Sequence, residues 1–471
     1  MGIRQREAAT ICETSPIPRC GFPVGFHPIW VHFSDKSARI QHLERVETDF
    51  RAGRRHLLLN SHVRRLRIVN RPIMPQNLES QFRERLPRCG EEDPQYVTEL
   101  VDVILSAASE AGATDVHLLP GEDAMEMRWR LDGVLQSVAM FSARLAPRIV
   151  ARLKVLSDLL TYQTEMPQEG RIRDAGDFET RVSTFPALYG EKCVVRLFAG
   201  AGRYDRLDRL NLPQDILTHI RRLLQQTTGV FMVTGPAGCG KTTTNYACLR
   251  EIVDNSGSGK SLVSLEDPIE VVVPGVTQSQ VNQAAGFDLT VGLRSLMRQD
   301  PEVIMVGEIR DREVAETVFQ ASLTGHLVVT TFHAGSAAEA VNRLSDMGIE
   351  PFLLKSGLLG ILSQRLLRRL CACAQPSAER DDRMGLAVEQ ATMPVGCSDC
   401  QGTGYRGRFV VAEMLTVEDD AIGEAIRERR DARFLEQTAI SAGMVTSLSR
   451  ACEAVNQGIT SPAEVRRVFG F

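Results

Sequence analysis

The stretch Gly235-Pro236-Ala237-Gly238-Cys239-Gly240-Lys241-Thr242, followed by Thr243, decides how the rest of the chain is interpreted. It fits G-x-x-x-x-G-K-[ST], the pattern of loops that cradle the phosphates of a nucleoside triphosphate. An apolar run at 229–234 predicts a buried strand before the loop, and 241–255 predicts a helix after it. Glycines let backbone N–H groups turn inward, and the helix N-terminus adds partial positive charge for phosphate oxygens. Lys241 would reach the β- and γ-phosphates and the Thr242 hydroxyl would hold Mg²⁺. A glycine-rich turn without a ligand is the alternative, and the strand–loop–helix context argues against it.

Composition places the chain among ordinary globular proteins. It has 471 residues, 43% hydrophobic and 24% charged, with a net charge of −4, so several domains are expected and wholesale disorder is excluded. No run of 18 apolar residues predicts a membrane-spanning helix, and the N-terminus lacks the apolar core of a signal peptide. Eleven cysteines, an odd and unevenly spread number, favour a reducing cytosol over a disulfide framework.

The N-terminal part divides into two segments. Residues 1–90 hold 16 Lys/Arg against 8 Asp/Glu, are interrupted by prolines, and predict a basic, weakly ordered arm with at most one short strand pair. Residues 95–200 predict a small α+β domain that begins with a helix at 95–111. Its other expected elements are a helix at 142–160 and strands at 115–119, 126–131, 171–173, 179–185 and 192–198. A polar linker at 201–212 follows.

Residues 213–471 predict an α/β domain. Strands at 229–234, 262–265, 303–306 and 327–331 alternate with helices, which implies a mostly parallel sheet between helices. The basic, amphipathic run 353–370 predicts another helix. A cysteine-containing insertion at 371–408 precedes a region expected to be helical.

Acidic residues and histidines follow three of these strands. Glu308 ends the run Val303–Val306-Gly307 and could orient or deprotonate an attacking water, the alternative being a surface charge at a strand end. Glu266 or Asp267 could bind Mg²⁺ through water, or could belong to a solvated turn. His326 and His333 lie at the two ends of one predicted strand, where they would either sense the γ-phosphate or be structural.

Four motifs occur in a fixed order: the phosphate loop, the acidic stretch at 266–270, the stretch at 307–311 that contains Glu308, and the stretch that contains His326 and His333. In this order they resemble the secretion ATPase superfamily, most closely the type II secretion and type IV pilus assembly ATPases, over roughly residues 95–470. The resemblance implies a RecA-like P-loop ATPase domain preceded by a PAS-like domain. It also implies a cytoplasmic, Mg²⁺-dependent homo-hexamer that hydrolyses ATP. Such a hexamer would lie peripherally at the inner membrane and act on a platform protein and associated secretion or pilus components.

The same resemblance assigns further site residues. Arg171 and Arg181 match arginines that reach the terminal phosphates when the first domain closes, and guanidinium suits charge spread over phosphoryl oxygens. By spacing alone they are exposed strand arginines. Cys371, Cys373, Cys397 and Cys400 match cysteines that bind structural Zn²⁺ in these relatives, and four thiolates suit tetrahedral zinc. The first pair, however, has C-x-C spacing in place of C-x-x-C, so a metal-free loop with reduced thiols stays the alternative.

Other functions fit the sequence less well than an assembly ATPase does. A pilus retraction or DNA-uptake ATPase is disfavoured because retraction relatives generally lack the cysteine insertion. A hydrolytically silent nucleotide-binding regulator is disfavoured because all catalytic boxes keep their key residues. A nucleic-acid translocase would need aromatic stacking residues beside the basic arm, and aromatic residues are only 6% of the chain, so no specific nucleic acid is expected.

Overall fold

The computed structural model describes residues 76–173, 179–197, 204–256, 259–418 and 420–471. The expected arm at 1–90 therefore falls mostly outside the described residues, as does the start of the expected linker at 201–203. Among the residues that are described, no helix combines the length and apolar character needed to cross a membrane.

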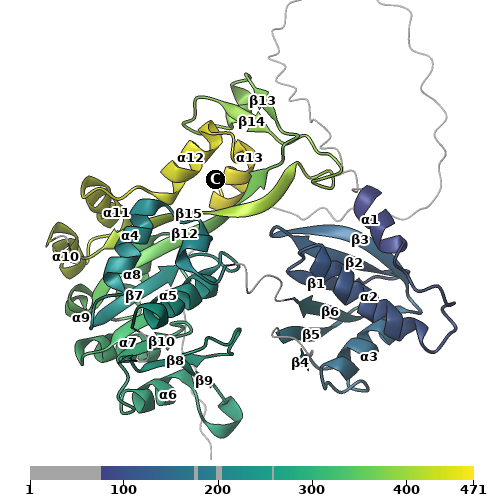
Figure 1. Ribbon diagram of the computed structural model, residues 1–471, viewed down its shortest axis with the longest axis horizontal. Helices are drawn as coiled ribbons and strands as arrows, with labels where there is room; N and C mark the ends of the chain where they lie inside the picture. The colour runs from purple at the N-terminus through teal and green to yellow at the C-terminus, as the bar shows by residue number, and fades with distance from the viewer. Residues whose placement is uncertain (1–75, 174–178, 198–203, 257–258, 419) are drawn as a thin grey trace, which may run out of the picture. The chain divides into compact units, whose positions relative to one another are not determined.

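The first sheet is antiparallel, with six strands in the order β3-β2-β1-β6-β5-β4 (Figure 1). These strands are β1 (Asp115–Pro120), β2 (Ala124–Leu131), β3 (Val134–Ser142), β4 (Gln168–Arg173), β5 (Glu179–Ala187) and β6 (Gly190–Arg196). Its helices are α1 (Gln76–Arg83), α2 (Tyr96–Glu110) and α3 (Ala146–Leu156). Alternate residues of β2 are buried, as expected for a sheet with one face on a core. Val101 of α2, Met127 of β2 and Leu153 of α3 belong to that core.

The predicted helices and strands of this segment are confirmed, and two elements were missed. Strand β3 lies between the expected strand at 126–131 and the expected helix at 142–160, and α1 forms in the arm, where at most one short strand pair was expected. Leu78 and Phe82 of α1 are each 2% exposed and lie in the same core as α2. This core therefore begins before residue 95, where the domain was expected to start.

The second sheet has seven strands in the order β15-β12-β7-β11-β10-β8-β9, and all neighbours are parallel except β15 and β12. Its strands are β7 (Gly229–Thr234), β8 (Leu262–Glu266), β9 (Thr277–Gln280), β10 (Val303–Val306), β11 (Leu327–Phe332), β12 (Leu358–Leu370) and β15 (Tyr405–Thr416). The expected mostly parallel sheet is confirmed.

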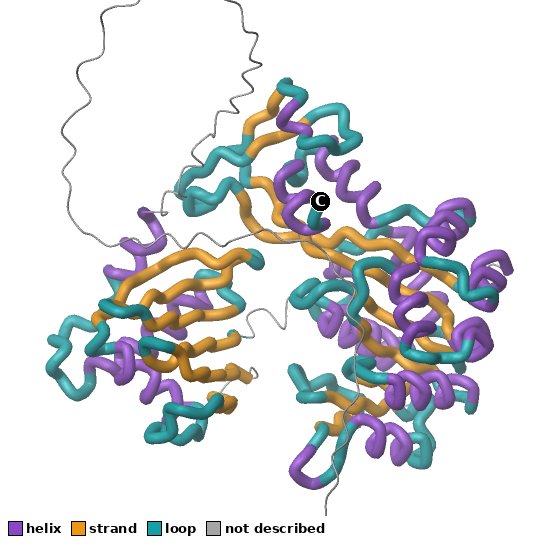
Figure 2. Tube along the Cα trace, turned by 180° about the vertical axis from the view of Figure 1, so that it is seen from behind, coloured by secondary structure: helices purple, strands orange, loops and turns teal. Residues whose placement is uncertain are grey.

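Helices cover both faces of this sheet (Figure 2). Val230 and Met232 of β7 point into one core, whereas Phe231 and Val233 point into the other. The helices are α4 (Gln214–Leu223), α5 (Lys241–Ser256), α6 (Leu289–Leu296), α7 (Arg312–Leu323), α8 (Ala337–Asp346) and α9 (Pro351–Gly357). Burial on both faces explains why these strands read as continuous apolar runs.

The expectation of a helix over 353–370 is wrong. Helix α9 ends at Gly357, and β12 continues through Leu370 as a strand parallel to β7 and antiparallel to β15. Because a central strand packs apolar side chains on both faces, its apolar residues do not alternate, and their spacing mimicked a helix.

The C-terminal region is helical only after β15, a strand that the sequence had not indicated. The four helices that follow it are α10 (Asp420–Arg427), α11 (Ala432–Ser441), α12 (Ser447–Asn456) and α13 (Pro462–Phe469). Between β12 and β15, the cysteine-containing insertion forms the small hairpin of β13 (Gln375–Ser377) and β14 (Ala391–Met393).

Candidate functional site: the carboxyl edge of the parallel sheet

The loop 235–240 joins β7 to α5 in the expected strand–loop–helix arrangement. Gly235, Gly238 and Gly240 have φ values of 145°, 74° and 90°, a region that side chains with a Cβ rarely adopt. Pro236, Ala237 and Gly238 are exposed, whereas Cys239 is buried beneath them. The loop thus exposes residues 236–238 to solvent and packs against the domain through Cys239.

Lys241 lies at the start of α5 and bends back over this loop. Its Nζ donates hydrogen bonds to the carbonyl oxygens of Gly235 at 3.0 Å and Pro236 at 3.2 Å. Burial lowers the pKa of Lys241, and the nearby Glu308 carboxylate opposes that shift. Thr242 and Thr243 follow in the first turn of α5, Thr242 partly exposed and Thr243 exposed. The loop carbonyls hold an ammonium group where phosphate oxygens are expected to bind.

Glu308 and His333 meet beside Lys241. They follow β10 and β11, which are neighbouring parallel strands, so both residues lie at the same edge of the sheet. His333 Nδ1 lies 3.4 Å from Lys241 Nζ, and its Nε2 lies 3.3 Å from Glu308 Oε2. On its other side, Glu308 accepts a hydrogen bond from Arg310 Nε, and Arg310 Nη1 donates to Asp267 at 2.8 Å. A continuous polar chain therefore runs from the phosphate loop to the acidic box, which is the stretch Glu-Asp-Pro-Ile-Glu at residues 266–270.

Glu266 ends β8 and is 2% exposed. Ser264 Oγ donates to its carboxylate at 2.6 Å, Gln278 Nε2 donates at 3.0 Å, and the Tyr246 hydroxyl donates to its other oxygen. Three donors satisfy a buried carboxylate without a cation. This geometry gives Glu266 a role in joining α5 to β8 and β9.

Glu270 is the last carboxylate of the acidic box, after Glu266 and Asp267. Burial raises the pKa of Glu270, the Glu266 carboxylate adds to the shift, and the nearby Thr242 side chain opposes it. Its backbone N–H donates to the Tyr246 hydroxyl at 3.1 Å. Glu270 therefore lies near Thr242, the predicted Mg²⁺ ligand.

His326 is not brought to this edge. It precedes β11, while His333 follows it, and a six-residue strand spans about 20 Å. Its Nδ1 lies 2.9 Å from the Ala321 carbonyl oxygen and 3.2 Å from Thr324 Oγ1, at the end of α7.

Arg171 and Arg181 lie on the first sheet. They are directly opposite each other in the antiparallel register of β4 and β5. Cross-strand partners project from the same face of a sheet, so the two guanidinium groups share one face.

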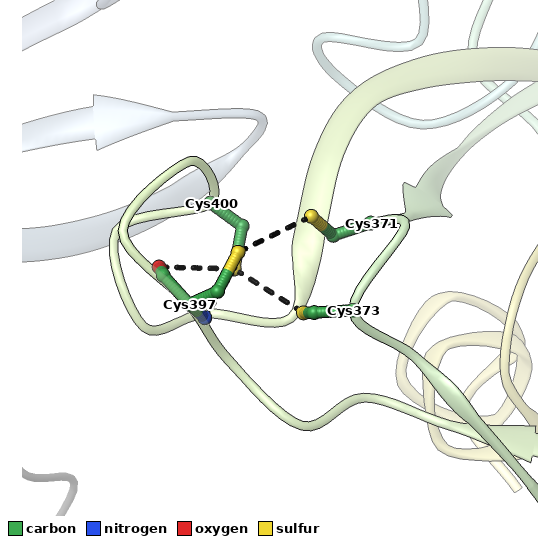
Figure 3. Close-up of side chains that lie close together, drawn as sticks. All are labelled: Cys371, Cys373, Cys397 and Cys400. Carbon is green, nitrogen blue, oxygen red and sulfur yellow. Dashed lines mark hydrogen bonds between the residues drawn. The ribbon is translucent and has the colours of Figure 1, made fainter.

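The four cysteines of the insertion form one cluster, with all four Sγ atoms within 4.8 Å of one another. The Sγ–Sγ distances are 3.8 Å for Cys371–Cys397, 3.8 Å for Cys373–Cys400 and 3.7 Å for Cys397–Cys400 (Figure 3). Tetrahedral zinc with Zn–S bonds of about 2.3 Å requires sulfur atoms about 3.8 Å apart. The donor set and its spacing therefore fit zinc despite the single residue between Cys371 and Cys373.

Backbone hydrogen bonds also prepare this cluster for a metal. Cys400 Sγ accepts from the N–H groups of Cys397 and Gly404, each at 3.1 Å. Burial alone would raise the pKa of Cys400, but these hydrogen bonds outweigh it and lower the pKa to about 7. A thiolate is the form of cysteine that ligates zinc.

Several residues of the site had not been singled out from the sequence, namely Tyr246, Glu270, Gln278 and Gln364. Glu270 could have been found, because it is the last acid of the box Glu-Asp-Pro-Ile-Glu. Gln364 could not, because it lies in the run that was interpreted as a helix.

Comparison with known proteins defines the class of this chain. Residues 90–467 match the family described as "Type II/IV secretion system protein", and the chain belongs to that family. Its relatives include the type II secretion system ATPase E of Vibrio cholerae, 41% identical over 388 residues, which cover 80% of this chain and 76% of the relative. The type IV pilus assembly ATPase PilB of Thermus thermophilus is 36% identical over 405 residues, covering 83% of this chain and 45% of that protein. The resemblance inferred from the sequence boxes is confirmed, and the chain is a homologue of these secretion and pilus assembly ATPases.

Solved structures support the fold. The Legionella pneumophila ATPase DotB matches with a TM-score of 0.59 and 19% identity, covering 82% of this chain and 98% of that one. The pilus retraction motor PilT with bound ADP matches with a TM-score of 0.54 and 23% identity, covering 78% and 96%.

Proposed function

We propose that this chain hydrolyses ATP to ADP and phosphate at the carboxyl edge of its parallel sheet, and that it powers protein secretion or pilus assembly. The observation that carries this proposal is the contact chain from Lys241 through His333 to Glu308. It joins the ammonium group of Lys241, which would bind phosphate, to the imidazole of His333 and the carboxylate of Glu308.

Each residue of this chain has a distinct part in the proposed reaction. Lys241 exchanges the loop carbonyls for phosphate oxygens and offsets their charge. Glu308 orients a water molecule and accepts its proton as the water oxygen attacks the γ-phosphorus and the bond to the β-phosphate oxygen breaks. His333 lies between them and couples the binding of the γ-phosphate to the position of Glu308.

The site also fits Mg²⁺, because Thr242 offers a hydroxyl and Glu270 a carboxylate, the oxygen donors that this ion prefers. When bound, Mg²⁺ would offset charge on the phosphates and orient them. Glu266 holds Tyr246 and Gln278 and thereby keeps the acidic box in place.

We infer that the two sheets belong to two domains, a PAS-like domain and a RecA-like domain, connected through residues 201–212. Arg171 and Arg181 would complete the site by binding the terminal phosphates when the domains close. Such an arrangement favours a homo-hexamer in which neighbouring subunits contribute to each site. By analogy with its relatives, the hexamer would lie in the cytoplasm at the inner membrane and act on a platform protein.

The cysteine cluster is assigned a structural Zn²⁺. All four thiolates would serve as ligands, which leaves no open position for a substrate. The metal would hold the end of β12 to the start of β15 and stiffen this part of the chain.

Phosphate release by the purified full-length protein tests the function directly. We expect turnover that requires Mg²⁺ and is abolished in Lys241→Ala but not in Lys260→Ala, a substitution outside the site. Light scattering with ATP should detect a hexamer. ATP binding without phosphate release by the wild type would replace this proposal with the silent regulator.

A further inference from the structure

Strand β12 lies directly against the phosphate loop. Ser363 pairs with Thr234, the last residue of β7, and Gln364 is the next residue along β12. A Cβ atom on Gly235 would collide with the Gln364 carbonyl oxygen, so glycine is required where the two segments approach. The loop is therefore built on β12 as well as on its own flanking strand and helix.

The Gln364 side chain is 2% exposed and makes two hydrogen bonds to the loop and its helix. Its Nε2 donates to the Cys239 carbonyl oxygen at 2.8 Å. Its Oε1 accepts from Thr244 Oγ1 at 3.0 Å. A side-chain amide carries both a donor and an acceptor, whereas a carboxylate carries acceptors alone and an apolar side chain carries neither.

The bond to Cys239 determines the orientation of a peptide group in the loop. A trans peptide is planar, so the Cys239 C=O and the Gly240 N–H point in opposite directions. Because the carbonyl points toward Gln364, the Gly240 N–H points away from β12. Inward-facing backbone N–H groups are the ones that hold phosphate oxygens in loops of this kind.

The next residue of β12 contacts the loop that carries His333. Arg365 Nη2 donates to the Gly335 carbonyl oxygen at 2.8 Å, and Arg365 Nη1 donates to the Val468 carbonyl oxygen at 3.0 Å. Two successive side chains of one strand thus support the phosphate loop and the histidine loop.

We propose that Gln364 is a positioning residue for nucleotide binding, which holds the Cys239–Gly240 peptide in the orientation that binds phosphate. This inference rests on the proposed binding of ATP at the phosphate loop. Gln364 does not touch the reacting atoms. Loss of the Gln364 side chain would weaken phosphate binding by the loop equally in the substrate complex and in the transition state, so KM should change more than kcat.

Gln364→Glu tests this inference because it keeps the size of the side chain and replaces the donor with an acceptor. In the full-length protein with MgATP, we expect KM to rise about tenfold or more and kcat to stay within about threefold. Calorimetry with MgADP should show a matching loss of affinity. Thr244→Val, which removes only the second hydrogen bond, should raise KM by less than about threefold. Gln226→Glu makes the same change on the exposed surface after α4 and should leave both constants unchanged.

Thermal unfolding without nucleotide separates positioning from folding. If Gln364→Glu fails to fold, Gln364→Met removes the same donor without adding charge and is measured in its place. A variant that unfolds at lower temperature but keeps the wild-type KM would overturn the inference, as would a fall in kcat at unchanged KM. Absence of turnover by the wild type would instead count against the proposed function, so the two failures are distinguishable.

Discussion

His333 Nε2 lies 3.3 Å from Glu308 Oε2, although the two residues follow different strands and are separated by 25 positions in the chain. The parallel register of β10 and β11 places both residues at one edge, and Lys241 reaches the opposite nitrogen of the same imidazole. The imidazole therefore connects the cation of the phosphate loop with the carboxylate proposed as general base.

Glu308→Gln should separate binding from hydrolysis. The amide keeps the size of the side chain but cannot accept a proton from water, so we expect kcat to fall about 10²- to 10⁴-fold with the affinity for MgATP retained. Steady-state phosphate release and calorimetry measure the two quantities. Glu313→Gln, an exposed change in α7, should leave both at wild-type values. Unchanged turnover in Glu308→Gln would remove Glu308 from the mechanism.

Two carboxylates of the acidic box, Glu266 and Glu270, should behave differently. Glu270 lies near Thr242, so Glu270→Gln should raise the Mg²⁺ concentration needed for half-maximal activity about tenfold or more, with little change in thermal stability. Glu266 is buried among three donors, so Glu266→Gln should lower the free energy of unfolding by about 1–3 kcal/mol. Magnesium titrations and thermal unfolding of both variants check this pair of expectations. The reverse pattern would assign the metal to Glu266.

The cysteine cluster should hold about one zinc ion per chain, because four sulfur atoms supply one tetrahedral shell. Elemental analysis of protein purified without chelators measures this content. Cys400→Ser should lose zinc and unfold at lower temperature, whereas Cys452→Ser, outside the cluster, should keep it. Because zinc must displace the protons of all four thiols, zinc affinity should decline as the pH falls, and more steeply below about pH 7, where Cys400 also takes up a proton. A zinc-free wild type with unchanged stability in Cys400→Ser would favour the metal-free loop.

Glu464 should make stability depend on acidity. Its side chain is fully buried and accepts hydrogen bonds from Arg368 at 2.7 Å and Arg467 at 2.6 Å. Burial alone would raise the pKa of Glu464, but these hydrogen bonds outweigh it and hold the pKa below its usual range. A lowered pKa in the folded state means that the contribution is present above about pH 4.3, the value expected in the unfolded chain, and is lost as the pH falls further.

Glu464→Gln should therefore lower the free energy of unfolding by about 3 kcal/mol at pH 7, because two arginines lose their charged partner. The difference from wild type should shrink in thermal unfolding experiments below about pH 4.3. Glu453→Gln, exposed on α12, is the matched control and should behave as wild type. A difference that stays constant from pH 7 to pH 3.5 would contradict this account.

Local sequence was sufficient for the phosphate loop and for the acids at strand ends. The glycines of 235–240 and the apolar runs of β7, β8 and β10 can be recognised within a few residues. The reason is that a positive φ favours glycine, and burial on both faces of a sheet favours apolar residues. The same local signals correctly placed Glu308 and His333 immediately after strands.

Local patterns failed where pairing with a distant strand decided the outcome. Residues 358–370 carry apolar side chains at helical spacing, yet β7 on one side and β15 on the other supply hydrogen-bonding partners for a strand. That pairing also brings Gln364 to Cys239, a contact across 125 positions.

The sequence by itself determined the class of protein and the identity of the phosphate loop, because both depend on short stretches with specific residue types. Only the tertiary structure decided which side chains share the site. It placed Glu270 beside Thr242, enclosed Glu266 among neutral donors and left His326 at the far end of its strand. The physical reason is that strand order, register and burial arise from contacts between residues far apart in the chain.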